Sequence, residues 1–226
     1  MAGIDDVYTR EVHKELNLYG AWPPDTNFRL GDYGEFAGCI FKRIGNITDD
    51  FGISLQEEVT DDDEITFTSK GVVNVDLKVE VDSQGRATGS AKLNVQFNRD
   101  NAVFFLATGI KTRRVANMKA MGDALIAVYR RPGKDWRLNM AVITELKTAR
   151  ELVALISRKN RAALGLRGKV KVGKNKPTTV DLQALEVEVN NSDVVNFLDE
   201  NGSTPLFRLH QVRDPATGKP FLDTQP

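Results

Sequence analysis

The chain has 226 residues, of which 41% are hydrophobic and 27% are charged, and its 31 basic and 31 acidic residues balance to a formal net charge of zero. This composition excludes a largely disordered chain and a general electrostatic attraction to nucleic acid or membranes, so a charged partner would have to recognise a local patch. The single cysteine, Cys39, excludes an internal disulfide, and the acidic N-terminus has no apolar signal core, so we expect a cytoplasmic protein.

The first quarter of the chain predicts one helix followed by short strands. Apolar residues recur at helical spacing over residues 8–16, which predicts a short amphipathic helix. Glycines punctuate residues 28–47, which we therefore expect to form short strands. Residues 49–64 are rich in acids and are expected to be solvated. Residues 61–64 lack the alternating ligands of a calcium loop, so we expect an acidic turn there and no metal.

Residues 73–97 have the pattern of a long β-hairpin. Every second residue from 73 to 81 is apolar, and the period of two resumes from residue 87 after the turn signal Ser83-Gln84-Gly85-Arg86. Each arm has roughly the 9–11 residues of a membrane β-strand. The same alternation fits a half-buried hairpin over an ordinary core, and the pattern alone does not separate the two interpretations.

The remaining segments predict several strands and two more helices. An unbroken apolar run at residues 102–109 indicates a buried strand. Within residues 112–131 the apolar residues recur at helical spacing along one side, which indicates a helix that ends at Pro132-Gly133. Strands are expected at residues 136–146, 151–157, 164–172, 180–189 and 203–212, with a short helix at 192–198. The fold class is therefore α+β, with a twisted, mainly antiparallel sheet, long hairpins and a few flanking helices.

The sequence contains no pattern typical of catalysis. His13 lies in a helix pattern and His210 in a strand, and neither has a cysteine or a carboxylate pair at ligand spacing. Cys39 precedes two apolar residues, the usual setting of an inert buried thiol. We expect no enzymatic activity, no cofactor and no metal.

One segment concentrates positive charge, because no acid occurs between Glu151 and Asp181. Its basic residues are Arg158, Lys159, Arg161, Arg167, Lys169, Lys171, Lys174 and Lys176. Near an anionic membrane each would contribute about 1 kcal/mol of attraction. This basic segment contains no aromatic residues that would stack on bases, so we expect no nucleic-acid partner. Apolar residues alternate through residues 164–172, which together with the strand at 151–157 predicts a second long hairpin.

The order of these parts resembles the pore-forming domain of gasdermins, including bacterial members. The resemblance is carried by REVHKELNLYG, FRLGDYG and FKRIGNI near the N-terminus, by MAVITELKTARELVALISRKNRAALGLRG, and by STPLFRLHQV at residues 203–212. Bacterial members typically carry a lipidated cysteine just after the initiator methionine, whereas this sequence begins MAGIDD.

The resemblance implies a gasdermin-like domain over residues 1–212 and a polar tail over residues 213–226 that acts as an autoinhibitory latch. A protease would remove the tail, and the domains would then move from the cytoplasm to the membrane and oligomerise into a β-barrel pore, as in a bacterial cell-death effector of antiviral defence. The membrane-inserting candidates are Val73, Val75, Leu77, Val79, Val81, Leu93, Val95, Phe97, Leu152, Leu155, Leu164 and Leu166. The basic residues above would bind anionic lipids.

A second interpretation stays open at this point. Charged residues between the apolar positions of the first hairpin suit a water-filled lumen, but they also suit an ordinary solvated sheet. The chain could then be a non-lytic, soluble α+β binding or scaffold protein that docks a partner through its basic hairpin.

Overall fold

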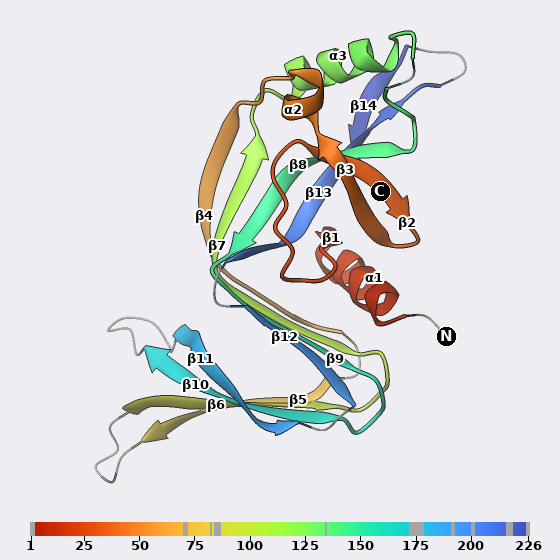
Figure 1. Cartoon of the computed structure of the whole chain (residues 1–226). Coiled ribbons are helices and arrows are strands. Elements are labelled where there is room, and N and C mark those ends of the chain that lie inside the picture. Colours follow the sequence, from red (N-terminus) through yellow and green to blue (C-terminus); the bar gives the residue numbers. More distant parts are fainter. Residues whose placement is uncertain are drawn as a thin grey trace.

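Strands make up most of the chain in the computed structural model (Figure 1). The structure describes residues 3–69, 72–81, 83, 87–133, 135–171, 179–190, 193–199, 202–215 and 219–224. The helices are α1 (Ile4–Leu16), α2 (Ile47–Phe51) and α3 (Met118–Tyr129) in this part of the chain. Its strands are β1 (Tyr19–Gly20), β2 (Asp32–Ala37), β3 (Ile40–Asn46), β4 (Glu57–Thr68), β5 (Val72–Val81), β6 (Ala87–Phe97), β7 (Val103–Val115), β8 (Met140–Ala149), β9 (Glu151–Ser157), β10 (Ala163–Lys171), β11 (Thr179–Asn190), β12 (Val194–Asp199), β13 (Ser203–Arg213) and β14 (Phe221–Thr224).

These strands form a larger and a smaller sheet, and all the pairings between described strands are antiparallel. The larger sheet runs β1-β13-β8-β7-β9-β12, with β2, β3, β4 and β14 attached at its sides. The smaller sheet has the order β11-β10-β6-β5 and lies at the bottom of Figure 1. The predicted α+β fold class, with a mainly antiparallel sheet and long hairpins, is confirmed.

The long strand β7 organises the larger sheet. One side of β7 pairs with β4, while on the other side its first half pairs with β9 and its second half with β8. The change of partner falls at Gly109, where φ is +58° and an added Cβ would lie 2.9 Å from the Cβ of Arg150. Only glycine tolerates both conditions without strain. Gly109 therefore lets two consecutive strands share one side of β7.

The half of the larger sheet that contains β9 is buried on both faces. Val103 and Phe105 of β7 belong to the hydrophobic cluster under α1, whereas Phe104 and Leu106 belong to the cluster that faces the four-stranded sheet. A strand covered on both faces has no solvated side, which explains the unbroken apolar runs at residues 102–109 and 151–157. Both predicted strands are confirmed, and so is the N-terminal helix, which ends at Leu16.

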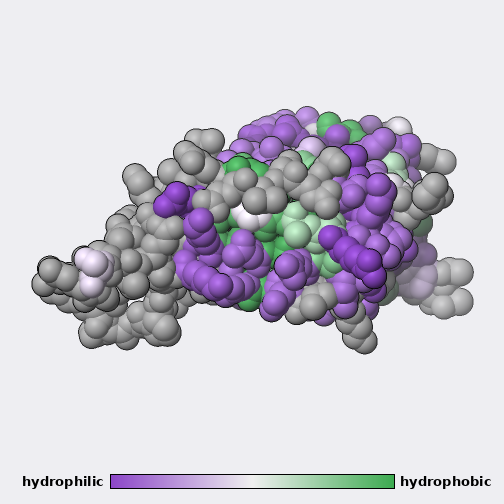
Figure 2. Space-filling view, turned by 90° about the horizontal axis from the view of Figure 1, so that it is seen from below, coloured by the Kyte–Doolittle hydropathy of each residue, from purple (hydrophilic) through white to green (hydrophobic). Residues whose placement is uncertain are grey.

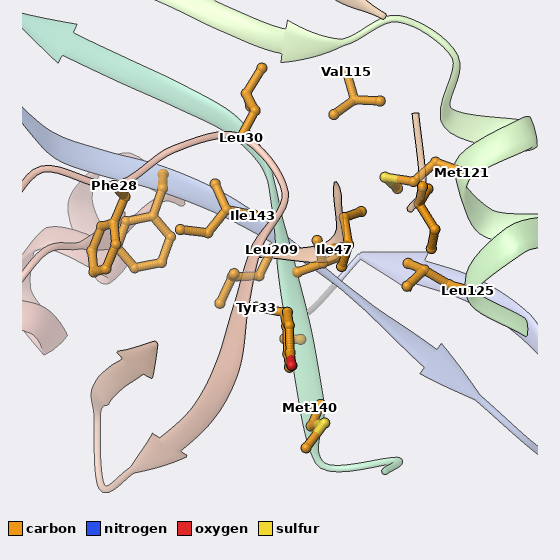
Figure 3. Packing of buried hydrophobic residues seen from close by; sticks show 14 of the residues in the cluster. Phe28, Leu30, Tyr33, Ile47, Val115, Met121, Leu125, Met140, Ile143 and Leu209 are labelled. Carbon is orange, nitrogen blue, oxygen red and sulfur yellow. The ribbon is translucent and has the colours of Figure 1, made fainter. Parts of the chain in front are cut away.

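The other half of the larger sheet packs against α2, α3 and the β2–β3 hairpin. Figure 3 shows Met121 and Leu125 of α3 pointing toward Ile47, the first residue of α2. All three side chains are fully buried. The predicted helix is confirmed, but it begins at Met118, because the residues before it extend β7 and pair with β4 as far as Val115.

Two sequence predictions about local structure are wrong. Residues 194–198 of the helix expected at 192–198 form part of β12 and pair with β9, and the adjacent valines suit a strand better than a helix. Residues 49–64 contain part of α2 and much of β4, and most of their described side chains are exposed, as expected for a solvated run. The expected acidic turn at 61–64 therefore lies within a strand. β4 pairs only with β7 in the described part of the chain, so its acidic side chains can reach solvent from the edge of the sheet.

The expected second hairpin has different partners. β9 pairs with β7 and β12 in the larger sheet, whereas β10 pairs with β6 and β11 in the smaller one. The hairpin that carries the basic segment is therefore β10–β11, and β9 packs against it face to face. Alternation along a strand specifies its faces and not its neighbours, so the sequence pattern did not distinguish these arrangements.

Candidate functional site

The two amphipathic hairpins meet in the four-stranded sheet. β5 and β6 pair as expected from the sequence, and β10 adds to β6 so that Leu164 lies opposite Val95 and Leu166 opposite Leu93. β11 then adds to the outer side of β10. Residues directly opposite each other lie on one face. The apolar positions of both hairpins therefore combine into one continuous face.

The larger sheet covers the centre of this apolar face. The inserting candidates with buried side chains are Leu93, Val95, Phe97, Leu152, Leu155, Leu164 and Leu166. Most of them share a cluster with Phe104 and Val153, whereas Leu152 belongs to the cluster under α1. Four further candidates, Val73, Leu77, Val79 and Val81, lie in β5, and their side chains fall outside the described part of the structure.

The apolar face continues beyond the layer that covers it. Val75 of β5 is 43% exposed although its partner Val95 is fully buried. Val187 of β11 is 38% exposed although its partner Leu166 is fully buried. In the described part of the chain, β5 and β11 each have one neighbour, so they form the two open edges of the sheet. Each open edge thus carries an exposed valine.

The opposite face of the four-stranded sheet is polar and carries a basic row. Lys78, Lys92 and Arg167 are opposite one another across β5, β6 and β10. An ion pair of 3.1 Å joins Lys78 to Asp76 on the same strand. Figure 2 shows the molecule from this side, with hydrophilic residues around a small area of hydrophobic surface. Lys78 and Lys92 lie far in sequence from the basic segment, so sequence reasoning did not include them in this row.

The basic residues predicted from the sequence are only partly brought together. Arg158 and Arg161 are exposed in the β9–β10 connection, and Lys159 there forms a 3.0 Å ion pair with Asp193. Arg167 is exposed on β10, one strand away from Lys92. The backbones of Lys169 and Lys171 lie in β10, but their side chains fall outside the described structure, as do Lys174 and Lys176 entirely.

Part of the C-terminal segment that the sequence predicted as a tail forms strand β14. It pairs with the end of β13 from His210 opposite Thr224 to Arg213 opposite Phe221. Leu222 packs over Gly122 of α3, where an added Cβ would lie 3.3 Å from the Cβ of Leu222. Before β14 begins, Tyr129 Oη donates a 2.6 Å hydrogen bond to the carboxylate of Asp214, which contributes to raising the tyrosine pKa. A strand pairing, an apolar contact and a hydrogen bond therefore hold this segment.

His210 links β14 to the interior of the larger sheet. Its Nδ1 lies 2.8 Å from Thr144 Oγ1 on β8, and its Nε2 lies 3.3 Å from Thr224 Oγ1 on β14. Burial lowers the pKa of His210, and nearby Arg208 lowers it further, against the opposite influence of Asp223 and Glu145. The lowered pKa therefore favours the neutral form of the imidazole near pH 7.

The described residues contain no group of three or more histidine, cysteine or acidic side chains arranged to hold a metal ion. His13 stacks on Tyr19 with ring centroids 4.6 Å apart. Cys39 is exposed at the β2–β3 turn, so the expectation of a buried thiol is wrong, because a tight turn leaves its tip uncovered. None of the described helices is long and apolar enough to span a membrane.

Comparison with solved structures finds a similarity to a bacterial gasdermin from Bradyrhizobium tropiciagri. The match has 16% sequence identity and a TM-score of 0.39, and it covers 98% of this chain and 91% of the other. No family model and no curated protein matches the sequence.

Proposed function

We propose that this chain is a latent membrane pore-forming protein without enzymatic activity. In this proposal a protease releases the C-terminal segment that contains β14, and the two hairpins then leave the larger sheet and enter a membrane. The observation that carries the proposal is the four-stranded sheet, in which two amphipathic hairpins store a continuous apolar face against the protein's own core.

The lengths and patterns of the four strands suit a membrane. β5, β6, β10 and β11 have 10, 11, 9 and 12 residues, close to the roughly 9–11 that a tilted strand needs to cross the hydrocarbon layer. A buried leucine, valine or phenylalanine is stabilised by about 1.5–3 kcal/mol relative to exposure to water. The apolar face would therefore leave the core only for another apolar environment, and lipid provides one.

The two open edges offer a route to assembly. A spanning sheet must pair its edge strands, because unpaired backbone groups are very costly in lipid. β5 of one copy and β11 of the next could pair in a head-to-tail interface, which generates a ring if the rotation closes. The exposed Val75 and Val187 lie on these edge strands. We propose that copies of the chain pair in this way and close into a β-barrel pore.

The basic residues give the released form a preference for anionic lipid. Arg158, Arg161 and Arg167 have exposed side chains, and each would add about 1 kcal/mol of attraction to an anionic surface. Such a contribution falls with ionic strength. Proteolysis would therefore move a protein that rests in the cytoplasm to membranes rich in anionic lipid, where release of cell contents would suit a cell-death or antiviral defence role.

The C-terminal segment is the proposed latch. β14 pairs over only four residues, and covalent attachment to β13 gives this short strand a high effective concentration. Cutting the connection between Asp214 and Phe221 would remove that advantage, so the strand would dissociate. The release would reach the hairpins through the larger sheet, because β14 pairs with β13 and β13 pairs with β8. β8 continues directly into β9 beneath the stored apolar face.

The test uses a specific protease site placed between Asp214 and Phe221 and liposomes that contain dye and anionic lipid. We expect dye release after cleavage and none before it. Replacing Val75 and Val187 with aspartate should abolish release, because both would carry a charge into lipid, while surface binding persists. Replacing Val59 with aspartate is the matched control and should leave dye release unchanged, since this valine is 54% exposed on β4 outside the hairpins.

The same experiment addresses the alternative function. If the cleaved, folded protein binds liposomes without dye release, the pore-forming proposal fails and a non-lytic binding role is favoured. If the Val75 and Val187 variant still releases dye at the normal rate, the hairpins are not the inserting elements.

A further inference from the structure

His210 lies where three strands and one helix come together. β13 carries the histidine between β8 and β14. Its Nδ1 contacts a threonine on β8, and its Nε2 contacts a threonine on β14. The same residue lines a cavity of about 350 Å³ between α3 and β14, together with Gly122, Ile126, Phe221 and Leu222. The imidazole is therefore in direct contact with the proposed latch.

The hydrogen bonds assign the neutral tautomer of this histidine. Thr144 Oγ1 donates to the carbonyl oxygen of Arg208 at 3.4 Å, so its oxygen is free to accept the Nδ1–H of His210. The bare Nε2 then accepts from the hydroxyl of Thr224. Protonation would add a hydrogen to Nε2, and the Thr224 hydroxyl would have to turn and accept instead. The hydrogen bond can survive this change, so the cost of protonation comes from burying a cation.

The charged groups around His210 only partly compensate that cost. On β8, Glu145 forms a 3.8 Å ion pair with Arg208 of β13, so the two charges largely offset each other at the histidine. On β14, Asp223 favours the protonated form. On α3, Lys119 and Asp123 line the same cavity and carry opposite charges. Apolar side chains of the cavity supply no compensation, and burial remains the dominant influence on the histidine pKa, which is lowered.

We infer that protonation of His210 releases β14 from the sheet, which makes the C-terminal strand a pH-sensitive latch. When β14 detaches, the imidazole loses its contact with Thr224 and gains water on that side. The released state therefore binds a proton more readily than the docked state. The inference rests on the proposed function only for the role that it gives to the released strand.

The direction of the pH effect follows from linkage. The pKa of His210 is lowered below 6.5 while β14 is docked, and it returns toward that value on release. Docking is thus fully favoured above about pH 6.5 and weakens as the pH falls from there toward the docked pKa. With one proton involved, the ratio of released to docked strand can rise at most about tenfold per pH unit.

Hydrogen exchange on the intact chain, without membranes, tests the inference. Exchange of the peptide that contains residues 221–224 is measured from about pH 7.5 to about pH 5.5 and divided by the intrinsic rate at each pH. We expect protection to fall by up to about tenfold per unit below pH 6.5. The His210→Gln variant should lose this dependence, because glutamine keeps hydrogen-bonding groups but does not titrate. The His13→Gln variant is the matched control and should keep it.

Two results would overturn the inference: an unchanged pH dependence in His210→Gln, or constant protection in the unaltered chain. If the glutamine variant does not fold, NMR titration of the His210 ring in the unaltered protein decides the question, and a pKa at or above the ordinary value contradicts the inference. The outcome is independent of pore formation. Release of β14 by acid without any dye release would support the pH-sensitive latch and contradict the pore-forming proposal. Dye release after cleavage, together with pH-independent exchange, would support the pore-forming proposal and contradict the pH-sensitive latch.

Discussion

Replacing Gly122 with alanine should change the stability of the protein differently in the presence and in the absence of β14. Gly122 is buried in the middle of α3, and the three atoms nearest to an added Cβ all belong to Leu222, at 3.3, 3.4 and 4.0 Å. The first contact is tighter than an ordinary van der Waals separation, and the second lies at the lower limit of that range. Alanine at this position therefore meets the latch and nothing else at close range.

The expected magnitudes come from two competing effects. Alanine in a helix interior is about 1 kcal/mol more favourable than glycine. Overpacking a well-fitted contact costs about 1–3 kcal/mol. In the intact chain the two effects cancel or the cost prevails, so stability stays level or falls. In a chain that ends at Arg213 the contact with Leu222 is missing, and stability should rise by about 1 kcal/mol.

Urea unfolding of both chain lengths, each with and without the substitution, measures this difference. Ala120→Gly is the matched control, because Ala120 is exposed on the same helix and should cost about 1 kcal/mol in both chains. A rise of equal size for Gly122→Ala in both chains would refute the packing of β14 on α3. An intact chain that gains stability while the shorter one does not would refute it equally.

Three other substitutions test separate parts of the structure. Glu151→Ala removes the acceptor of the 2.6 Å hydrogen bond from buried Thr108, so thermal or urea unfolding should show a loss of about 1–3 kcal/mol, with a smaller loss for Glu151→Gln. Leu166→Ala, at a fully buried position between the sheets, should cost about 2–5 kcal/mol in the same assay, whereas Val187→Ala should cost much less. Charge reversal of Arg158, Arg161 and Arg167 should weaken binding of the cleaved protein to anionic liposomes by about 1 kcal/mol or more per residue, and unchanged binding would remove these residues from the lipid contact.

Local patterns predicted the elements whose environment is simple. The first hairpin alternates apolar and polar residues along both arms, and the two arms pair as expected. The helix α3 has its apolar side on the core, where Met121, Leu125 and Val128 are buried. In both cases the periodicity of a single segment reports directly on what surrounds it.

Choices that depend on distant partners could not be predicted in this way. β12 is a strand because β9 offers it a free edge, and β9 itself joins the larger sheet because Gly109 and Arg150 allow a change of partner along β7. The C-terminal strand is a further case, since residues 221–224 are largely polar or exposed and are ordered by pairing with β13. None of these partnerships leaves a local periodic signal.

The most direct test of the proposed function follows neighbouring residues of β5 during membrane entry. Spin labels are attached in turn at Asn74, Val75 and Asp76 in a Cys39→Ser background, and cleavage is carried out on anionic liposomes. We expect the label at position 75 to become accessible to oxygen dissolved in lipid, while the labels at 74 and 76 stay accessible to a water-soluble reagent. Equal access of all three positions to the water-soluble reagent, in a cleaved protein that is folded and bound, would contradict insertion of the stored hairpins.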